Sequence, residues 1–444
     1  MRDSWQVCNA ITKLIKEQIQ CYNLKEKLIS QTYDGAATMR GTHGGVQTQM
    51  KETYPHAHFI HCYAHQLNLM MEQACTKQIS GIRVFFANLA AFPLFFQGSP
   101  KRMAALKKSC QRRLPRAGAT RWNFQSRTVN TVYESREDLV ECLTEIKSGQ
   151  TTIYNPESGT EENIQWDLET IGKASGLLKW LEDEQFMYFL RFFNRVMPHV
   201  DVLYGIIQSR NISVDMVSHA LSGFRRTLTE IRKELCESQP SDQGVPSTSK
   251  RRRTSEGNLK ASCIEACDVM IMQAEDRFSS VGNLIPLQLV DPTFFVLYAS
   301  NFPNDKLDMV PKYYPMVSKN KLTTELQVLS ESEDFHEKKN CLSLLDFLRE
   351  NNLSDVFSEV YQLLQITVTT PLTSAESERC FSTLKRILTF LRNTMDQGSQ
   401  VFAADLVQDT RNFNELVIDK FARLKNRRAE FLYKDAHALG EEDH

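Results

Sequence analysis

Apolar positions along the chain recur mainly at helical spacing, with two short exceptions near the start. Residues 4–24 carry a mainly apolar i, i+3, i+4 stripe, which predicts an amphipathic helix. Two short runs predict strands: 28–33, which ends at Asp34-Gly35, and 57–61, which follows a Tyr54-Pro55 break. A helical pattern over 63–76 follows the second run. This alternation of strands and helices indicates an α/β layer.

The remainder of the chain predicts helices. Long helical patterns cover 126–235 and 261–272, and their aromatic stripes are typical of a packed core rather than a cofactor pocket. Further apolar helices are expected around 342–348 and 357–364. The β-branched run 366–370 is then stopped by a proline, and a last helix begins after the capping residue Ser374. We therefore expect a mostly helical protein.

Composition narrows the class of protein. The 444 residues are 41% hydrophobic and 24% charged, as in ordinary soluble proteins. No window approaches the roughly 18 consecutive apolar residues of a membrane helix, and the N-terminus turns polar within a few residues, so we expect neither membrane insertion nor export. The eleven cysteines follow no regular framework, which is typical of reduced thiols in the cytosol or nucleus.

Charge is balanced overall but segregated locally. The chain has 53 basic and 54 acidic residues, yet the stretch 101–127 holds basic residues and no acidic one. This stretch is the strongest candidate for a polyanion-binding surface, although a solvated basic helix and loop gives the same pattern. Its candidate DNA-binding residues are Lys107, Lys108, Arg112, Arg113, Arg121 and Trp122.

A polar segment separates two of the helical patterns. Residues 236–262 are rich in Ser, Pro, Gly, Gln, Lys and Arg, which predicts a disordered linker. The linker contains the basic run Lys250-Arg-Arg-Arg253. Such a run suits a nuclear-import signal, and it equally suits a merely solvated stretch.

Three short clusters carry candidate chemistry. Asp34 follows the first predicted strand and precedes Gly35, an arrangement that exposes a carboxylate but is also an ordinary turn. Four histidines and Cys62 lie within 56–65, but no second cluster downstream would complete a zinc tetrahedron, so we expect no structural metal. The acidic residues around Glu378 open a helix, where they also complement its dipole.

In their order and context, these motifs resemble the hAT transposase superfamily. The resemblance rests on Ser30-Gln-Thr-Tyr-Asp34-Gly-Ala-Ala-Thr-Met39-Arg-Gly41, His61-Cys62-Tyr-Ala-His65-Gln-Leu-Asn-Leu69, Thr120-Arg-Trp122-Asn, and Pro371-Leu-Thr-Ser-Ala-Glu-Ser-Glu378-Arg-Cys-Phe-Ser-Thr-Leu384-Lys-Arg-Ile387. It covers nearly the whole chain. Among such proteins the sequence looks most like vertebrate proteins derived from these elements, the MYM-type and transposase-like zinc finger proteins.

The resemblance implies a fold and an arrangement of domains. It implies a ribonuclease-H-like α/β core, incomplete because its first strands are missing and interrupted by a large, mainly α-helical insertion. The expected parts are a partial core over 1–125, the helical insertion over 126–320, a C-terminal dimerisation region over 321–433 that closes the core, and a tail over 434–444.

The resemblance also assigns residues. Asp34 and Glu378 match the second and third members of a carboxylate triad that holds two divalent metals in the family. Cys62 and His65 match a pair that supports the active site. Trp122 matches a tryptophan able to stack on an unpaired base, an interaction of about 1–3 kcal/mol.

One member of the triad has no counterpart. The family's first aspartate lies upstream of the helix with which this chain begins, and no acidic residue before position 28 has a strand context. Asp34 and Glu378 are therefore expected to be vestigial, with no cofactor and no cleavage. An exposed sheet edge would make the α/β layer weak or dependent on a partner. The alternatives are a residual nuclease using magnesium or manganese, and a sequence-independent DNA-binding module.

Self-association is the family property that the resemblance preserves best. It implies contacts between protomers through the C-terminal region, although the same side chains also suit packing within one chain. We expect a nuclear homo-oligomer that allows a DNA partner and has no membrane or small-molecule substrate. The candidate dimerisation residues are Leu342, Leu345, Phe357, Leu363, Phe381 and Leu384.

Overall fold

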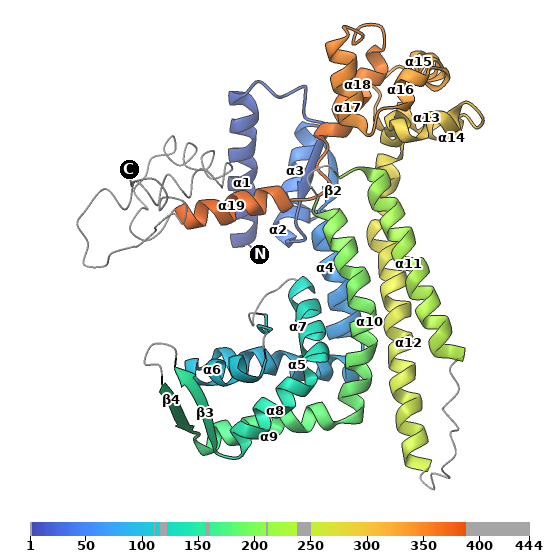
Figure 1. Ribbon diagram of the computed structural model, residues 1–444. Helices are drawn as coiled ribbons and strands as arrows, with labels where there is room; N and C mark the ends of the chain where they lie inside the picture. Colours follow the sequence, from blue (N-terminus) through green and yellow to red (C-terminus); the bar gives the residue numbers. More distant parts are fainter. Residues whose placement is uncertain are drawn as a thin grey trace, which may run out of the picture. The chain divides into compact units, whose positions relative to one another are not determined.

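The structure is a computed structural model that describes residues 2–110, 112–115, 122–155, 160–209, 212–237 and 250–387 (Figure 1). The chain divides into two units, Met1–Ser374 and Ala375–His444. In the described part of the second unit lies one helix, α19 (Ala375–Ile387). The described elements are predominantly helices, as the apolar spacing predicts. The ribonuclease-H-like character of the core stays an expectation.

The first unit begins with a small α/β layer, here called the N-terminal layer and comprising residues 2–61. Strands β1 (Ser30–Tyr33) and β2 (His58–His61) pair in parallel, with Ser30 opposite His58 and Tyr33 opposite His61. Parallel strands need a crossover connection, which helices α2 (Ala37–Arg40) and α3 (Val46–Thr53) provide. Helix α1 (Arg2–Cys21) packs against both of them.

The N-terminal layer has a small core of its own. Side chains from α1 and α3 bury one another, and residues flanking the two strands complete the group: Cys8, Ile19, Val46, Met50, Tyr54 and Ala57. This cluster is distinct from the main core of the first unit, which Ile60 of β2 joins. The layer therefore rests on two cores, of which its own is the smaller.

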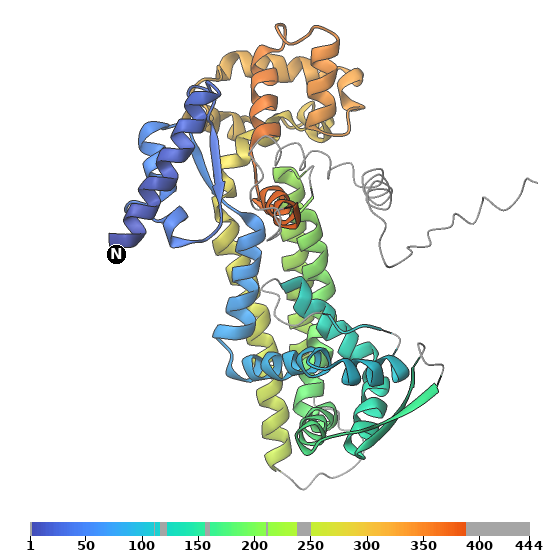
Figure 2. The same cartoon turned by 90° about the vertical axis from the view of Figure 1, so that its left-hand side faces the viewer.

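After β2 the chain enters a set of helices, here called the helical body (α4 to α12). A π-helical turn, η1 (Gln73–Lys77), continues α4. The helices are α4 (Tyr63–Glu72), α5 (Ser80–Gln97), α6 (Pro100–Ser109), α7 (Trp122–Glu134), α8 (Arg136–Lys147), α9 (Leu168–Glu182), α10 (Glu184–Ile207), α11 (Val214–Glu237) and α12 (Lys250–Phe278). The long helices α10, α11 and α12 run side by side (Figures 1 and 2).

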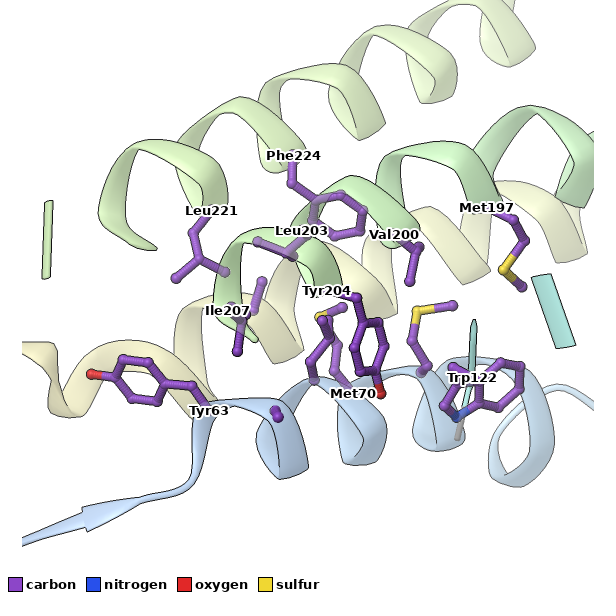
Figure 3. Packing of buried hydrophobic residues seen from close by; sticks show 14 of the residues in the cluster. Tyr63, Met70, Trp122, Met197, Val200, Leu203, Tyr204, Ile207, Leu221 and Phe224 are labelled. Carbon is purple, nitrogen blue, oxygen red and sulfur yellow. The ribbon is translucent and has the colours of Figure 1, made fainter. Parts of the chain in front are cut away.

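Aromatic rings fill much of this body. Phe193 of α10 stacks on Phe85 of α5 with ring centroids 5.6 Å apart, and it meets Phe86 edge to face at 4.7 Å. Farther along, α4 packs against α10 and α12, and α10 packs against α11. Figure 3 shows some of the apolar side chains involved, among them Met70 of α4, Leu203 of α10 and Phe224 of α11. The aromatic stripes are therefore core, as predicted from their spacing.

A β-hairpin inside this region was not predicted. Strands β3 (Gln150–Asn155) and β4 (Thr160–Gln165) pair antiparallel between α8 and α9. Gly149, at φ +94°, allows the chain to leave α8 and enter β3, because a residue with a side chain rarely adopts that backbone conformation. The apolar pattern over 126–235 predicts helix throughout. The run of β-favouring residues Thr-Thr-Ile-Tyr within β3 is the sequence feature that indicates a strand.

The remaining elements of the first unit are short helices. Cys341–Glu350 begins with a capping box in which Asn340 and Ser343 satisfy each other's backbone amides. The elements in chain order are η2 (Ser279–Val290), η3 (Pro292–Phe294), α13 (Phe295–Tyr298), α14 (Asn304–Tyr313), α15 (Lys319–Glu331), α16 (Glu333–His336), α17 (Cys341–Glu350) and α18 (Ser358–Thr369).

The structure corrects one local prediction. Part of the predicted linker is helical, because α12 begins at Lys250; buried residues farther along α12, such as Cys267 and Met270, pack it against neighbouring helices, and the helix continues from them toward Lys250. Residues 238–249 lie outside the described residues. The β-branched run that the proline stops forms the end of α18, where the hydroxyl of Thr367 donates to the carbonyl of Leu363.

No single helix among the described residues is long and apolar enough to cross a membrane. The bent pair 63–77 and 80–97 meets that limit only when its two members are taken together.

Candidate functional site

Asp34 lies at the carboxyl end of β1, where the sequence places it. Its side chain is exposed, and Oδ1 accepts a hydrogen bond from the backbone N–H of Ala36 at 3.1 Å. Because β1 and β2 are parallel, their carboxyl ends meet at one edge, and His61 ends β2 beside Tyr33. The predicted exposure of a carboxylate at a strand end is therefore observed.

Position 35 favours glycine because histidine side chains lie very close to its backbone, and not because the backbone is left-handed there. A Cβ added to Gly35 would lie 2.6 Å from Cδ2 of His65 and 3.1 Å from Nε2 of His61. No larger residue fits unless His65 moves. The glycine thus allows the turn after Asp34 to pass against the two imidazole rings.

The two histidines form the centre of this edge. Their rings stack with centroids 5.5 Å apart, and Nδ1 of His61 is hydrogen-bonded to the side-chain amide of Gln66. The Gln66 oxygen accepts from Arg277 at 3.4 Å. Arginine only donates, so the Gln66 NH₂ group faces Nδ1, and a neutral His61 carries its proton on Nε2.

The surroundings keep His61 neutral. Burial lowers the pKa of His61 to about 4, with His65, Arg40 and Arg277 acting in the same direction and Asp34 opposing them. Burial likewise lowers the pKa of His65, which Asp34 partly offsets. The Nε2 atom of His61 is buried and finds no hydrogen-bond partner among the described residues.

Hydrogen bonds of Cys62 and its neighbours connect this edge of the sheet to residues 371–374. Its sulfur is buried and accepts hydrogen bonds from Ser374, at 3.3 Å from the backbone N–H and 3.2 Å from the hydroxyl. The N–H of Tyr63 donates to the carbonyl of Leu372 at 3.1 Å, and the Thr32 hydroxyl donates to the carbonyl of Pro371. These contacts fix the end of the first unit, four residues before Glu378 in sequence, against the strand ends.

The resemblance implies a set of carboxylates that holds two metal ions. No group of three or more His, Cys, Asp or Glu side chains among the described residues has an arrangement that would hold a metal ion. Glu378 is exposed on α19 in the second unit, and Asp34 belongs to the first. The assignment of Asp34 and Glu378 to a metal-binding carboxylate set therefore stays a prediction.

Trp122 is placed differently from the prediction. Its side chain is 6% exposed and packs edge to face on Phe86 with ring centroids 5.2 Å apart, while its backbone N–H donates to Asn68. In this conformation the ring is part of the core and has no face open to a base, because the apolar indole gains more from burial against α5.

The predicted basic surface is partly neutralised. Lys107, Lys108, Arg112 and Arg113 are exposed. Lys108 pairs with Glu145 at 2.7 Å, and Arg112 pairs with Glu134. Arg121 lies outside the described residues. Lys107 and Arg113 form no ion pair with the described residues, and they therefore remain the exposed candidates for phosphate contacts.

The candidate dimerisation residues fall into two groups. Phe357 and Leu363 are buried within the chain, the former against Phe335 at 5.5 Å, and Leu345 is partly buried. Leu342 is 45% exposed on α17, and Phe381 is 69% exposed on α19. The side chain of Leu384 lies outside the described residues. Exposure therefore favours Leu342 and Phe381 for contacts with another molecule.

Sequence reasoning missed the arginines of this region. Arg40 stands within a motif that carried the resemblance, but no chemistry was assigned to it. Arg277, at the end of α12, gave no local signal, because only the fold brings it to Gln66 from 211 positions away.

Comparison with known proteins identifies the class of the C-terminal part. Residues 325–402 match the hAT family C-terminal dimerisation region. The chain therefore carries a hAT dimerisation region, and its resemblance to hAT-derived proteins is confirmed.

Two curated relatives extend the similarity beyond that region. The chain is similar to the 52 kDa repressor of the inhibitor of the protein kinase from Homo sapiens, with 22% identity over 424 residues. It is also similar to the protein of that name from Mus musculus, with 21% identity over 414 residues. Each comparison covers 87% of this chain and 54% of the relative, so the chain spans about half the length of the curated relatives it matches.

Proposed function

We propose that this chain is a domesticated hAT-transposase-like protein that self-associates through its C-terminal region and acts in DNA-associated regulation in the nucleus without catalytic activity. The observation that carries the proposal is the match of residues 325–402 to the hAT dimerisation region. The relatives named as repressors support a regulatory role.

Exposed apolar side chains in the matched region support self-association. Leu342, Val368 and Phe381 are each more than two-fifths exposed. Burying a side chain such as leucine or phenylalanine between two protomers contributes about 1.5–3 kcal/mol. Both the α17–α18 part and α19 therefore offer apolar surface for a second copy.

Light scattering after size exclusion tests self-association. The wild-type chain at micromolar concentration is expected to run as a dimer or larger, and Leu342→Glu together with Phe381→Glu is expected to shift it to a monomer. Leu168→Glu is the matched control, because Leu168 is exposed but lies outside the matched region. A monomeric wild type, or an equal loss in the control, contradicts the proposal.

The absence of catalysis is a separate part of the proposal. It is supported by the arrangement of the described side chains, among which no group of three or more His, Cys, Asp or Glu would hold a metal ion. Incubation with Mg²⁺ or Mn²⁺ and nicked DNA tests it, and no cleavage is expected. Cleavage that Asp34→Asn abolishes would overturn this part and favour the residual nuclease instead.

A further inference from the structure

A cavity of about 410 Å³ opens beside the end of β2. Three segments distant in sequence line it: the end of α2, β2 with the start of α4, and the last turns of α12. The lining side chains are those of Arg40, Phe59, His61, Gln66, Gln273, Asp276 and Arg277.

One of the lining residues, His61, has a buried donor without a partner. His61 is 9% exposed, and its Nε2 makes no hydrogen bond among the described residues. The chain from Arg277 through Gln66 to Nδ1 fixes the orientation of the Gln66 amide and leaves the His61 proton on Nε2. A buried N–H without an acceptor is unusual in a native structure, and here it lies directly behind the cavity-lining ring of His61.

Two guanidinium groups face the same space. Arg277 uses two of its N–H groups on neutral amides, Gln273 at 2.7 Å and Gln66 at 3.4 Å, which leaves three donors. The side chain of Arg40 forms no hydrogen bond or ion pair with the described residues. Burial lowers the pKa of Arg277 and the charge of Arg40 acts in the same direction, while Asp276 and Glu72 oppose them.

We propose that this cavity binds a phosphate group, held between Arg40 and Arg277 beside the ring of His61. Guanidinium groups match the geometry of phosphate oxygens and form short, charge-assisted hydrogen bonds with them. Of the lining side chains one, Asp276, is acidic, so the wall has an excess of positive charge. A cation would meet two guanidinium groups, whereas a phosphate relieves their repulsion.

Calorimetric titration of the full chain with inorganic phosphate, at constant ionic strength and pH 7, tests the proposal. Saturable binding is expected, and Arg277→Gln is expected to weaken it about tenfold or more, since a hydrogen bond to a charged group contributes about 1.5–3 kcal/mol. Arg40→Gln is expected to weaken it similarly, and because Arg40 is exposed and supports no neighbour, this variant remains informative if Arg277→Gln fails to fold.

Arg83→Gln is the matched control, since Arg83 is an exposed arginine outside the cavity. Its affinity for phosphate is expected to equal that of the wild type. An NMR measurement of the histidine ring nitrogens should show the His61 Nε2 resonance shifting on addition of phosphate. Absence of saturable binding, an equal loss in Arg83→Gln, or an unmoved His61 resonance overturns the proposal.

The same titration distinguishes two sources of the phosphate. A short single strand with a 5′-phosphate and the same strand with a 5′-hydroxyl are used as competitors. Displacement by the phosphorylated strand alone assigns a nucleic-acid end. Displacement by neither strand, with inorganic phosphate still bound, assigns a small phosphate compound.

Discussion

The N-terminal layer and the helical body are held together in different ways. The body is built on one continuous apolar core in which rings such as Phe85 and Phe193 stack directly. The layer has a small apolar cluster and depends in addition on polar contacts to distant segments. His58 bonds to the carbonyl of Tyr313 at 2.8 Å, and the Thr32 hydroxyl donates to the carbonyl of Pro371. The comparison teaches that a two-stranded sheet too small to stand alone is anchored by residues that arrive much later in the chain.

The largest effect is expected in the core of the body. Phe193→Ala removes a ring that touches Phe85 and Phe86, and it should lower the free energy of unfolding by about 3–5 kcal/mol. Denaturant unfolding followed by tryptophan fluorescence measures this loss. Val202→Ala on the same helix is 63% exposed and should change little, so an equal loss in both variants would show that the ring cluster does not dominate the body.

A smaller and more local effect is expected in the layer. Met50→Ala removes a buried side chain from the small cluster. It should lower the free energy of local unfolding of the layer by about 2–5 kcal/mol. Hydrogen exchange should speed up in α1, α3 and β1 but not in α10. Val7→Ala on the exposed side of α1 is the control. Equal acceleration in α10 would mean that the two regions unfold as one.

Acid should also distinguish the layer from the body. The pKa of His61 is about 4 in the folded chain and near 6.5 when unfolded, so between these values the unfolded state binds more protons. Neutral His61 therefore contributes to the free energy of unfolding, on the order of 1–3 kcal/mol. This contribution is fully present above pH 6.5 and is lost as the pH falls toward 4. Exchange rates in β2 measured from pH 7 to 4 report it. His61→Asn should flatten this dependence, and an unchanged profile would assign the acid sensitivity to other groups.

The smallest effect is expected at the cap of a helix, α17. Asn340→Ala removes the side chain that accepts from the N–H of Ser343, and it should destabilise α17 by about 1 kcal/mol. The thermal midpoint measures the change. Asn320→Ala, an exposed position within α15, is the control. A loss as large as that of Phe193→Ala would mean that α17 depends on its cap more than on its buried Leu344 and Leu348.

The sequence predicts the helical body better than the site. Helices such as α10 repeat apolar residues at a spacing that only a helix places on one face, so local pattern determines them. The β3–β4 hairpin was missed because it interrupts a helical pattern over only a few residues. The exposure of Asp34 followed from Asp-Gly after a strand, whereas the burial of Trp122 depends on Phe86, a contact that spacing does not encode. Arg277 reaches Gln66 only through the fold.

The bonds between Cys62 and Ser374 join residues 312 positions apart, and this has a consequence for synthesis of the chain. Ribosomes add about 5–20 residues per second, so the strand ends wait roughly 15–60 s for their last partners to emerge. During that interval the Thr32 hydroxyl, the Cys62 sulfur and the Tyr63 N–H lack these partners. A chaperone that binds nascent chains would find its target there, and a transcript that ends before codon 371 would leave that target permanently uncovered.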